Sequence, residues 1–83
     1  MSLEDDLRKE TEKWTRKIKK EMKSVKAVKK PKDEKKSRFL ENIKAYIKDS
    51  EHFTGKGDLI RAFEAIVWAW AWLEILREME ILD

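Results

Sequence analysis

The residues that could do chemistry in this sequence are one histidine and two nearby aspartates. Asp49 precedes His52 by three residues, a helical spacing that brings both side chains to one side of a turn, and Asp58 follows after a short break. Imidazole and carboxylate groups are common ligands of divalent metals. His52, however, falls on the polar face of its predicted helix, opposite Ile43, where solvated histidines are ordinary. We therefore expect no metal site and no catalytic role here.

The sequence shows no set of residues that would support nucleophilic catalysis. The chain has no cysteine and a single histidine, and no triad is apparent. Tyr46 and Asp49 flank the junction between two predicted helices and could contact a ligand. The alternative, which we adopt, makes Tyr46 a core residue with a bonded hydroxyl and Asp49 a hydrogen-bond partner of the turn near Gly57. We predict that the protein is not an enzyme and has no cofactor.

Three of the four tryptophans lie in one apolar run, residues 59–76. Aromatic walls suit a small-molecule pocket, but helical spacing more often indicates a core, and we expect Trp14 and Trp70 there. For Trp68 and Trp72 the choice is between the core and a subunit contact, because large exposed aromatic patches mark interaction surfaces. The predicted interface comprises Trp68, Trp72, Ile75 and Met79.

Basic residues occupy one side of the first predicted helix. Several form like-charged pairs four residues apart, such as Lys13–Lys17 and Lys19–Lys23, each destabilising by about 0.2–0.5 kcal/mol. A polyphosphate or an acidic partner surface would relieve this repulsion; otherwise the row is a solvated face. No aromatic residue interleaves with it, which argues against nucleic acid. The candidate polyanion contacts are Lys13, Arg16, Lys17, Lys20 and Lys23.

The net charge of +3 hides an uneven distribution. Between Arg8 and Arg38, fifteen Lys or Arg oppose five Asp or Glu, whereas from Phe39 to Asp83 five oppose nine. Such a division between the halves of a chain suggests a polyanion partner or a self-complementary assembly.

At 83 residues the chain forms one domain, 1–83, near the size at which a single core is only just sufficient. Without cysteine, neither disulfides nor a thiolate metal site can support it. No secretory hydrophobic segment opens the chain, so we expect a cytoplasmic protein. Charged residues make up 45%, Gln is absent and Asn occurs once, a composition typical of hyperthermophiles.

The apolar run at 59–76 is predicted to be a helix of a water-soluble protein. Two glutamates and an arginine interrupt it, leaving fewer than the roughly 20 apolar residues that a membrane span needs. The alternation at 68–72 mimics a strand. The apolar pattern nevertheless continues to Ile81 with several alanines and no Gly or Pro, which favours a helix.

Apolar residues recurring every three or four positions predict two further helices. Pro31 separates the first two helices because proline disfavours helix at the preceding residue. Asp33 and Asp58 are expected to cap the second and third, and the second should stop near Gly55. Similar lengths and short connections predict an all-α, up-down-up three-helix bundle. The predicted helices lie near residues 3–28, 33–54 and 58–81.

The first helix presents a narrow apolar stripe centred on Ile18, which suits packing against two neighbours. The third is apolar around more of its circumference than two neighbours would cover. We expect a second subunit to cover Trp68 and Trp72; the alternative is that the first helix wraps further round and covers them within the monomer. The predicted core consists of Trp14, Ile18, Ile43, Ile47, Phe63, Ile66, Trp70 and Leu73.

Three passages carry a resemblance to a known family. They are Tyr46-Ile47-Lys48-Asp49 followed by Phe53, then Gly57-Asp58 with Ala62-Phe63, then Trp68-Ala69-Trp70-Ala71-Trp72-Leu73-Glu74. Together they resemble the archaeal domain-of-unknown-function family 357. The likeness covers the second and third helices, and the first matches only in being long and charged. It implies a compact three-helix bundle from an archaeon and carries no catalytic role.

The function that we predict is a helical interaction module without enzymatic activity. It would associate with itself as a homodimer, or with another protein, through the third helix. The alternative is nonspecific nucleic-acid binding through the basic face of the first helix. No membrane partner is expected.

Overall fold

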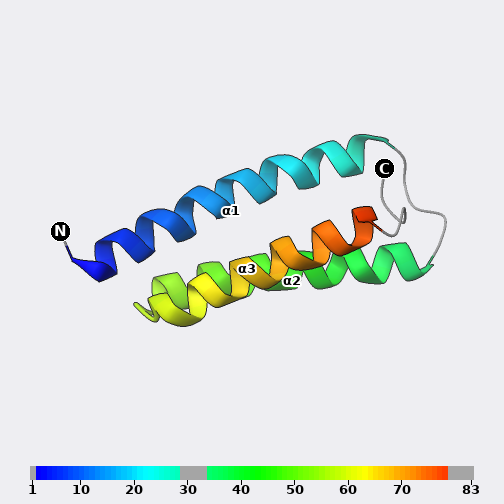
Figure 1. Cartoon of the computed structure of the whole chain (residues 1–83). Coiled ribbons are helices and arrows are strands. Elements are labelled where there is room, and N and C mark those ends of the chain that lie inside the picture. The colour runs from blue at the N-terminus through cyan, green and yellow to red at the C-terminus, as the bar shows by residue number, and fades with distance from the viewer. Residues whose placement is uncertain (1, 29–33, 79–83) are drawn as a thin grey trace.

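The computed structural model describes the backbone of residues 2–28 and 34–78 and the side chains of residues 2–23 and 38–78. Apart from Ser2 and the turn at 56–58, the described chain is helical. The helices run up, down and up along a molecule of 45 × 19 × 18 Å (Figure 1), which confirms the predicted bundle. The predicted end of the third helix at residue 81 lies outside the described residues. The elements are α1 (Leu3–Val28), α2 (Glu34–Gly55) and α3 (Leu59–Glu78).

The helix α1 begins at a side-chain cap. The Ser2 hydroxyl accepts a hydrogen bond from the Asp5 N–H at 3.1 Å, which satisfies one of the amide groups that open a helix. Glu4, Asp5 and Asp6 in the first turn place negative charge at the positive end of the helix dipole. Asp33, the expected cap of α2, lies outside the described residues.

The turn between α2 and α3 is closed mainly by main-chain hydrogen bonds. The Asp58 N–H donates to the Phe53 carbonyl at 2.9 Å and the Gly57 N–H to the Thr54 carbonyl at 3.1 Å. This is the Schellman arrangement, and Gly57 has the positive φ of 80° that it requires. The Asp58 carboxylate then accepts the Arg61 N–H at 3.2 Å, which confirms the predicted cap of α3.

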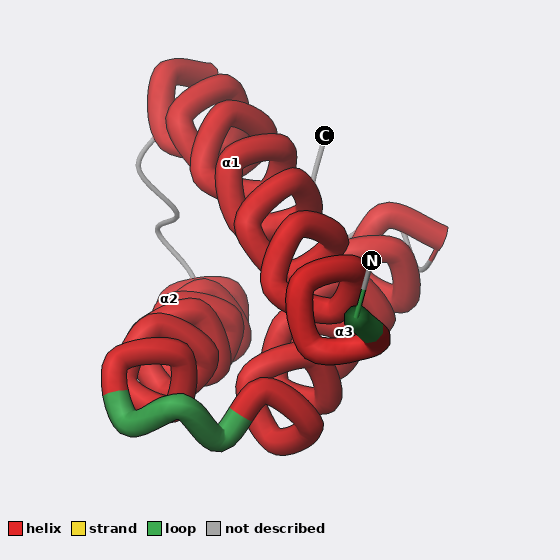
Figure 2. Tube along the Cα trace, turned by 90° about the vertical axis from the view of Figure 1, so that its left-hand side faces the viewer, coloured by secondary structure: helices red, strands yellow, loops and turns green. Residues whose placement is uncertain are grey.

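The two helices that meet at this turn, visible in Figure 2, have the most extensive contact of the three helix pairs. The face of α3 toward α2 carries small buried side chains, Ala62, Ala65 and Ala69, which allow the backbones to approach. Ser50 of α2 is fully buried, and its hydroxyl donates to the Ala62 carbonyl at 2.7 Å. A buried hydroxyl without such a partner would be destabilising, so this bond secures the register of the pair.

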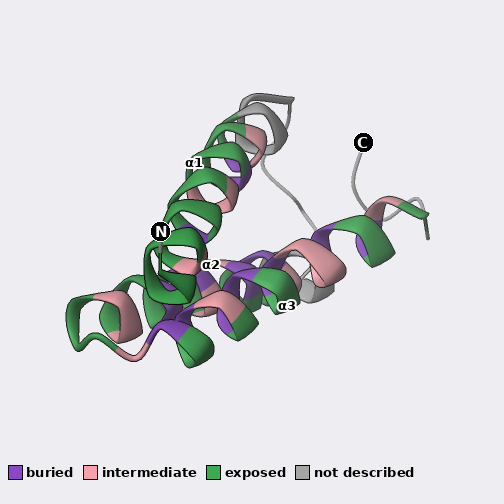
Figure 3. Ribbon diagram, turned by 60° about the vertical axis from the view of Figure 1, so that its left-hand side comes forward, coloured by how far each residue is buried: buried purple, intermediate pink, exposed green. Residues whose placement is uncertain are grey.

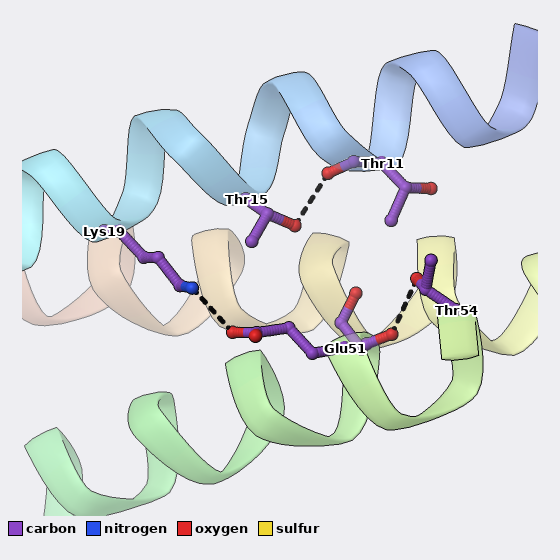
Figure 4. A network of polar contacts seen from close by, with 6 residues as sticks. Thr11, Thr15, Lys19, Glu51 and Thr54 are labelled. Carbon is purple, nitrogen blue, oxygen red and sulfur yellow. Dashed lines mark hydrogen bonds and ion pairs between the residues drawn. The ribbon is translucent and has the colours of Figure 1, made fainter. Parts of the chain in front are cut away.

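The helix α1 packs against both neighbours, as its stripe predicted, but mainly on α3 and much less on α2. Ile18 and Met22 supply its buried contacts, and the buried Thr11 hydroxyl bonds to the Leu7 carbonyl at 2.8 Å. An ion pair between Lys19 and Glu51, 2.8 Å long, spans α1 and α2 (Figure 4).

The core lies where the three helices face one another (Figure 3). The prediction was right for five residues, which are buried: Ile18, Ile43, Ile47, Ile66 and Leu73. It needs correction for Trp14, Phe63 and Trp70, which are only half-buried. The rings of Trp14 and Trp70 pack against the core but are not enclosed by it. The helix α1 is inclined to α3 (Figure 3).

Candidate interaction surfaces

The side of α3 turned away from the core is unusually apolar. Ile60 is 73% exposed, Val67 48%, Trp68 50% and Ile75 45%. At about 100° per residue they fall within an arc of about 100°. With Ala71 at the centre of that arc, these five residues form what we call the outer face of α3.

Few charges interrupt the outer face. Glu64 and Glu78 lie within its arc and are exposed, and Glu74 lies at its edge. The sequence therefore leaves water in contact with aliphatic and indole groups along nearly the whole helix. Several large apolar side chains exposed along one side of a helix are typical of interaction sites on soluble proteins.

Of the four predicted interface residues, Trp68 and Ile75 are on the outer face. Trp72 is half-buried, and its ring stacks on Phe39 of α2 with centroids 6.2 Å apart and planes at 21°. Within the monomer, α2 therefore provides an aromatic contact to Trp72. Met79 lies outside the described residues.

An open groove of about 340 Å³ runs between α1 and α3. Its walls are apolar and largely aromatic, with one carboxylate. The lining residues are Trp14, Phe63, Ile66, Val67, Trp70, Ala71 and Glu74. Val67 and Ala71 belong to both the groove and the outer face, so the two surfaces are continuous.

Two tryptophans, one from each helix, line the groove and contact each other. The rings of Trp14 and Trp70 meet edge to face, with centroids 5.7 Å apart and planes at 84°, a favoured aromatic geometry. The Trp70 indole N–H donates to the Trp14 carbonyl at 3.1 Å, and the Trp14 indole N–H donates to Glu10 at 3.0 Å. Both polar ends of the rings are satisfied, so the faces left open are apolar.

Opposite charges border the groove. On the α1 side, the Lys17 and Lys13 ammonium groups lie 4.8 and 5.4 Å from the Trp14 ring centroid, within the range of a cation–π contact. On the α3 side the border is Glu74. Near one end, Arg77 of α3 pairs with Glu21 of α1 at 2.6 Å and ties the two walls together.

The basic row of α1, which holds the candidate polyanion contacts, is exposed to solvent. In the described part of the chain, Arg16, Lys20 and Lys23 form no ion pair. Lys13 and Lys17 differ from them, because both lie against Trp14.

The residues first considered for chemistry do not come together. His52 is exposed and lies edge-on to its neighbour Phe53, and Asp49 is exposed on the same helix. Asp58 serves as the cap of α3. Across residues 2–28 and 34–78, no cluster of three potential metal-binding side chains is found. Nor does any helix in those ranges have the length and hydropathy of a membrane span.

Sequence reasoning missed the groove. It placed Trp14, Phe63 and Trp70 in a closed core and gave Val67 no role. One signal was available: Phe63, Val67, Trp70 and Glu74 recur at steps of three and four, which marks a second row on α3 beside the buried one. That row shows which side chains are neighbours but not whether α1 covers them.

Known proteins resemble this chain over nearly its whole length. The model of a family described as proteins of unknown function, DUF357, matches residues 13–82. The crystal structure of a protein from Archaeoglobus fulgidus, assigned to that family, is 50% identical, with a TM-score of 0.81 over 99% of this chain and 97% of the other. No match was found among curated proteins. The resemblance seen in the second and third helices is confirmed and extends into α1.

Proposed function

The chain belongs to the DUF357 family of proteins of unknown function, and on that premise we propose that it is a helical interaction module without enzymatic activity. It associates with itself, or with another protein, through the outer face of α3. The observation that carries this proposal is the exposure of Ile60, Trp68 and Ile75 along one side of a single helix.

Energetics support association. Burying one large apolar side chain contributes roughly 1.5–3 kcal/mol before the entropic cost of association is subtracted. The outer face offers four such side chains, of which Ile60 is mostly exposed and the other three about half exposed, so each contributes the corresponding part of that amount. A two-fold dimer is the commonest assembly for a face of this kind.

The test is the mass in solution. Light scattering at high micromolar concentration should give twice the monomer mass of 10.0 kDa. Trp68→Lys should give the monomer mass with unchanged helicity, because it places a charge in the contact while Trp68, half exposed, lies outside the hydrophobic core. We choose Trp68 rather than Trp72, since the stacking of Trp72 on Phe39 would mix folding with association.

A matched control adds the same charge elsewhere. Asn42→Lys, at an exposed position on α2, should leave the mass of the wild-type protein unchanged. A wild-type mass near 10 kDa at every concentration, together with no effect of Trp68→Lys on any protein partner, would contradict the proposal.

A second function has an observation of its own. The basic row of α1 is exposed, and Arg16, Lys20 and Lys23 have no carboxylate partner in the described residues. This supports nonspecific binding of a polyanion such as nucleic acid. The two functions use different helices and can be tested separately.

A further inference from the structure

Trp68 and the groove lie on opposite flanks of the outer face of α3. At about 100° per residue, the groove residues of α3 centre about 130° from Trp68 around the helix. Along the helix axis, Trp68 falls midway between Phe63 and Glu74, the two ends of the groove. One helix thus carries a protruding ring and, at the same height on its other flank, an apolar recess.

We propose that two copies of the chain pair through parallel α3 helices, with Trp68 of each copy inserted into the α1–α3 groove of the other. The inference rests on the proposed self-association and specifies its geometry. A two-fold axis running along α3 keeps each residue at its own height and sets each flank against the opposite flank of the second copy. An antiparallel pair would instead set Trp68 beside Trp68 and groove beside groove.

The groove has the size and chemistry to receive an indole ring. Its volume of about 340 Å³ is at the lower end for sites that hold small organic molecules. Trp14 and Trp70 offer aromatic faces and edges, which favour a third ring by stacking or edge-to-face contact. Lys17 and Lys13 beside Trp14 add cations that an indole face attracts.

Charge selects the same orientation. The pairs Trp14–Trp70 and Glu21–Arg77 are each 56 positions apart, so α1 runs parallel to α3 along the groove. In an antiparallel pair the two basic α1 helices would lie on the same side of the dimer and repel each other.

In the parallel pair the α1 helices lie on opposite sides. The Lys13 and Lys17 border of each then approaches the Trp68 flank of the other copy, where the exposed acidic residue is Glu64. Arg61 on that flank is already paired with Asp58 at 3.6 Å. The contact is therefore complementary in charge.

Single cysteines test the orientation, because the chain has none of its own. Ile60 and Glu78 lie at nearly the same angle on the outer face and about 27 Å apart along it. In a parallel pair, Ile60→Cys should form a disulfide with its own copy, and so should Glu78→Cys. In an antiparallel pair only a mixture of the two variants would cross-link, as Ile60→Cys to Glu78→Cys. Asn42→Cys on α2 is the control and should not cross-link.

A second variant tests the groove itself. Val67→Trp fills the groove from within its own copy and also adds apolar area to the outer face. Exclusion of the partner's Trp68 should weaken the dimer about tenfold or more. A contact through a featureless apolar face would become tighter instead. The dissociation constant is measured by sedimentation equilibrium, with circular dichroism to confirm that the helices are retained.

The results separate this inference from the proposed function. Self cross-linking at both ends of α3 together with a weaker Val67→Trp dimer supports it. A dimer that cross-links only between the two variants, or that tightens with Val67→Trp, overturns the inserted-Trp68 arrangement while self-association stands. A wild-type protein that stays monomeric at high micromolar concentration overturns self-association and the inference together.

Discussion

Gly57 adopts the backbone conformation that ends α2 and turns the chain into α3. Its φ of 80° belongs to the left-handed region, and an added Cβ would meet nothing within 4 Å. The requirement for glycine is therefore a property of the backbone and not of crowding. The same turn contains Gly55, which ends α2 in an ordinary helical conformation and also has open space around its Cα.

These two glycines should respond in opposite directions to alanine. Gly57→Ala should lower the free energy of unfolding by about 1–2 kcal/mol, because a Cβ opposes the left-handed conformation. Gly55→Ala should raise it by up to about 0.5–1 kcal/mol, since alanine loses less backbone entropy in a helix. Urea denaturation of both variants measures the difference. Equal shifts of the same sign would mean that the positive φ is not what makes Gly57 necessary.

Ser50 is a polar residue in the buried contact between α2 and α3. It lies on the same face of α2 as Ile43 and Ile47 and is fully buried. Its bond to the Ala62 carbonyl joins two positions twelve residues apart across the turn. Periodicity predicts the burial, but the partner follows only from the packing of α2 on α3.

The three helices differ in how extensively they are packed. The pair α2 and α3 is joined by a short turn, a row of alanines and a buried hydrogen bond, whereas α1 is held to α3 chiefly by Ile18, Met22 and the groove tryptophans. Its ion pairs to the other helices involve half-exposed side chains, which contribute little. The helix α1 is thus the element with the least packing to protect it.

We expect α1 to open before the α2–α3 pair. Backbone amides in α1 should exchange with deuterium faster than those of α3, because local opening is easiest where few apolar contacts are lost. Ile18→Ala, which removes a fully buried side chain, should widen the difference. Hydrogen exchange followed by mass spectrometry of peptides from each helix is the measurement. Identical protection in α1 and α3 would show a single cooperative unit instead.

At the scale of the whole molecule, charge and hydrophobicity are separated between two surfaces. The basic row of α1 faces solvent on one side, and the apolar outer face of α3 with the groove is on another. Association through α3 would leave Arg16, Lys20 and Lys23 accessible on a dimer. Two copies would then present two basic rows, which would strengthen any contact with a long polyanion.

Polyanion binding can be recognised by the dependence of its affinity on salt concentration. If α1 binds nucleic acid, affinity for an oligonucleotide should fall steeply between about 50 and 200 mM salt. Changing Arg16 and Lys20 to Glu should weaken binding and reduce the salt slope by about 2. The control, Lys48→Glu with Lys56→Glu, makes the same charge change on exposed residues outside α1. Equal losses in both double variants would point to net charge and not to α1.

The sequence by itself determined the number and order of the helices. Apolar residues at steps of three and four are needed for any helix that buries one side, and Gly57 with Asp58 encodes a helix end and a helix start within two positions. Both signals are local, so they could be recognised before any tertiary contact was known. The buried centre of each stripe, such as Ile18, Ile43 and Leu73, was equally predictable, because it stays covered under any packing of the faces.

Only the tertiary structure decided whether residues at the edges of those stripes are buried or exposed. Trp14, Phe63 and Trp70 line an open groove because α1 approaches α3 at an angle, and Trp72 is covered by Phe39 because α2 lies on that side. The physical reason is that periodicity states which side chains share a face. How much of that face is covered depends on the angle and distance at which the next helix arrives, and these are set by side-chain volumes such as the alanine row of α3.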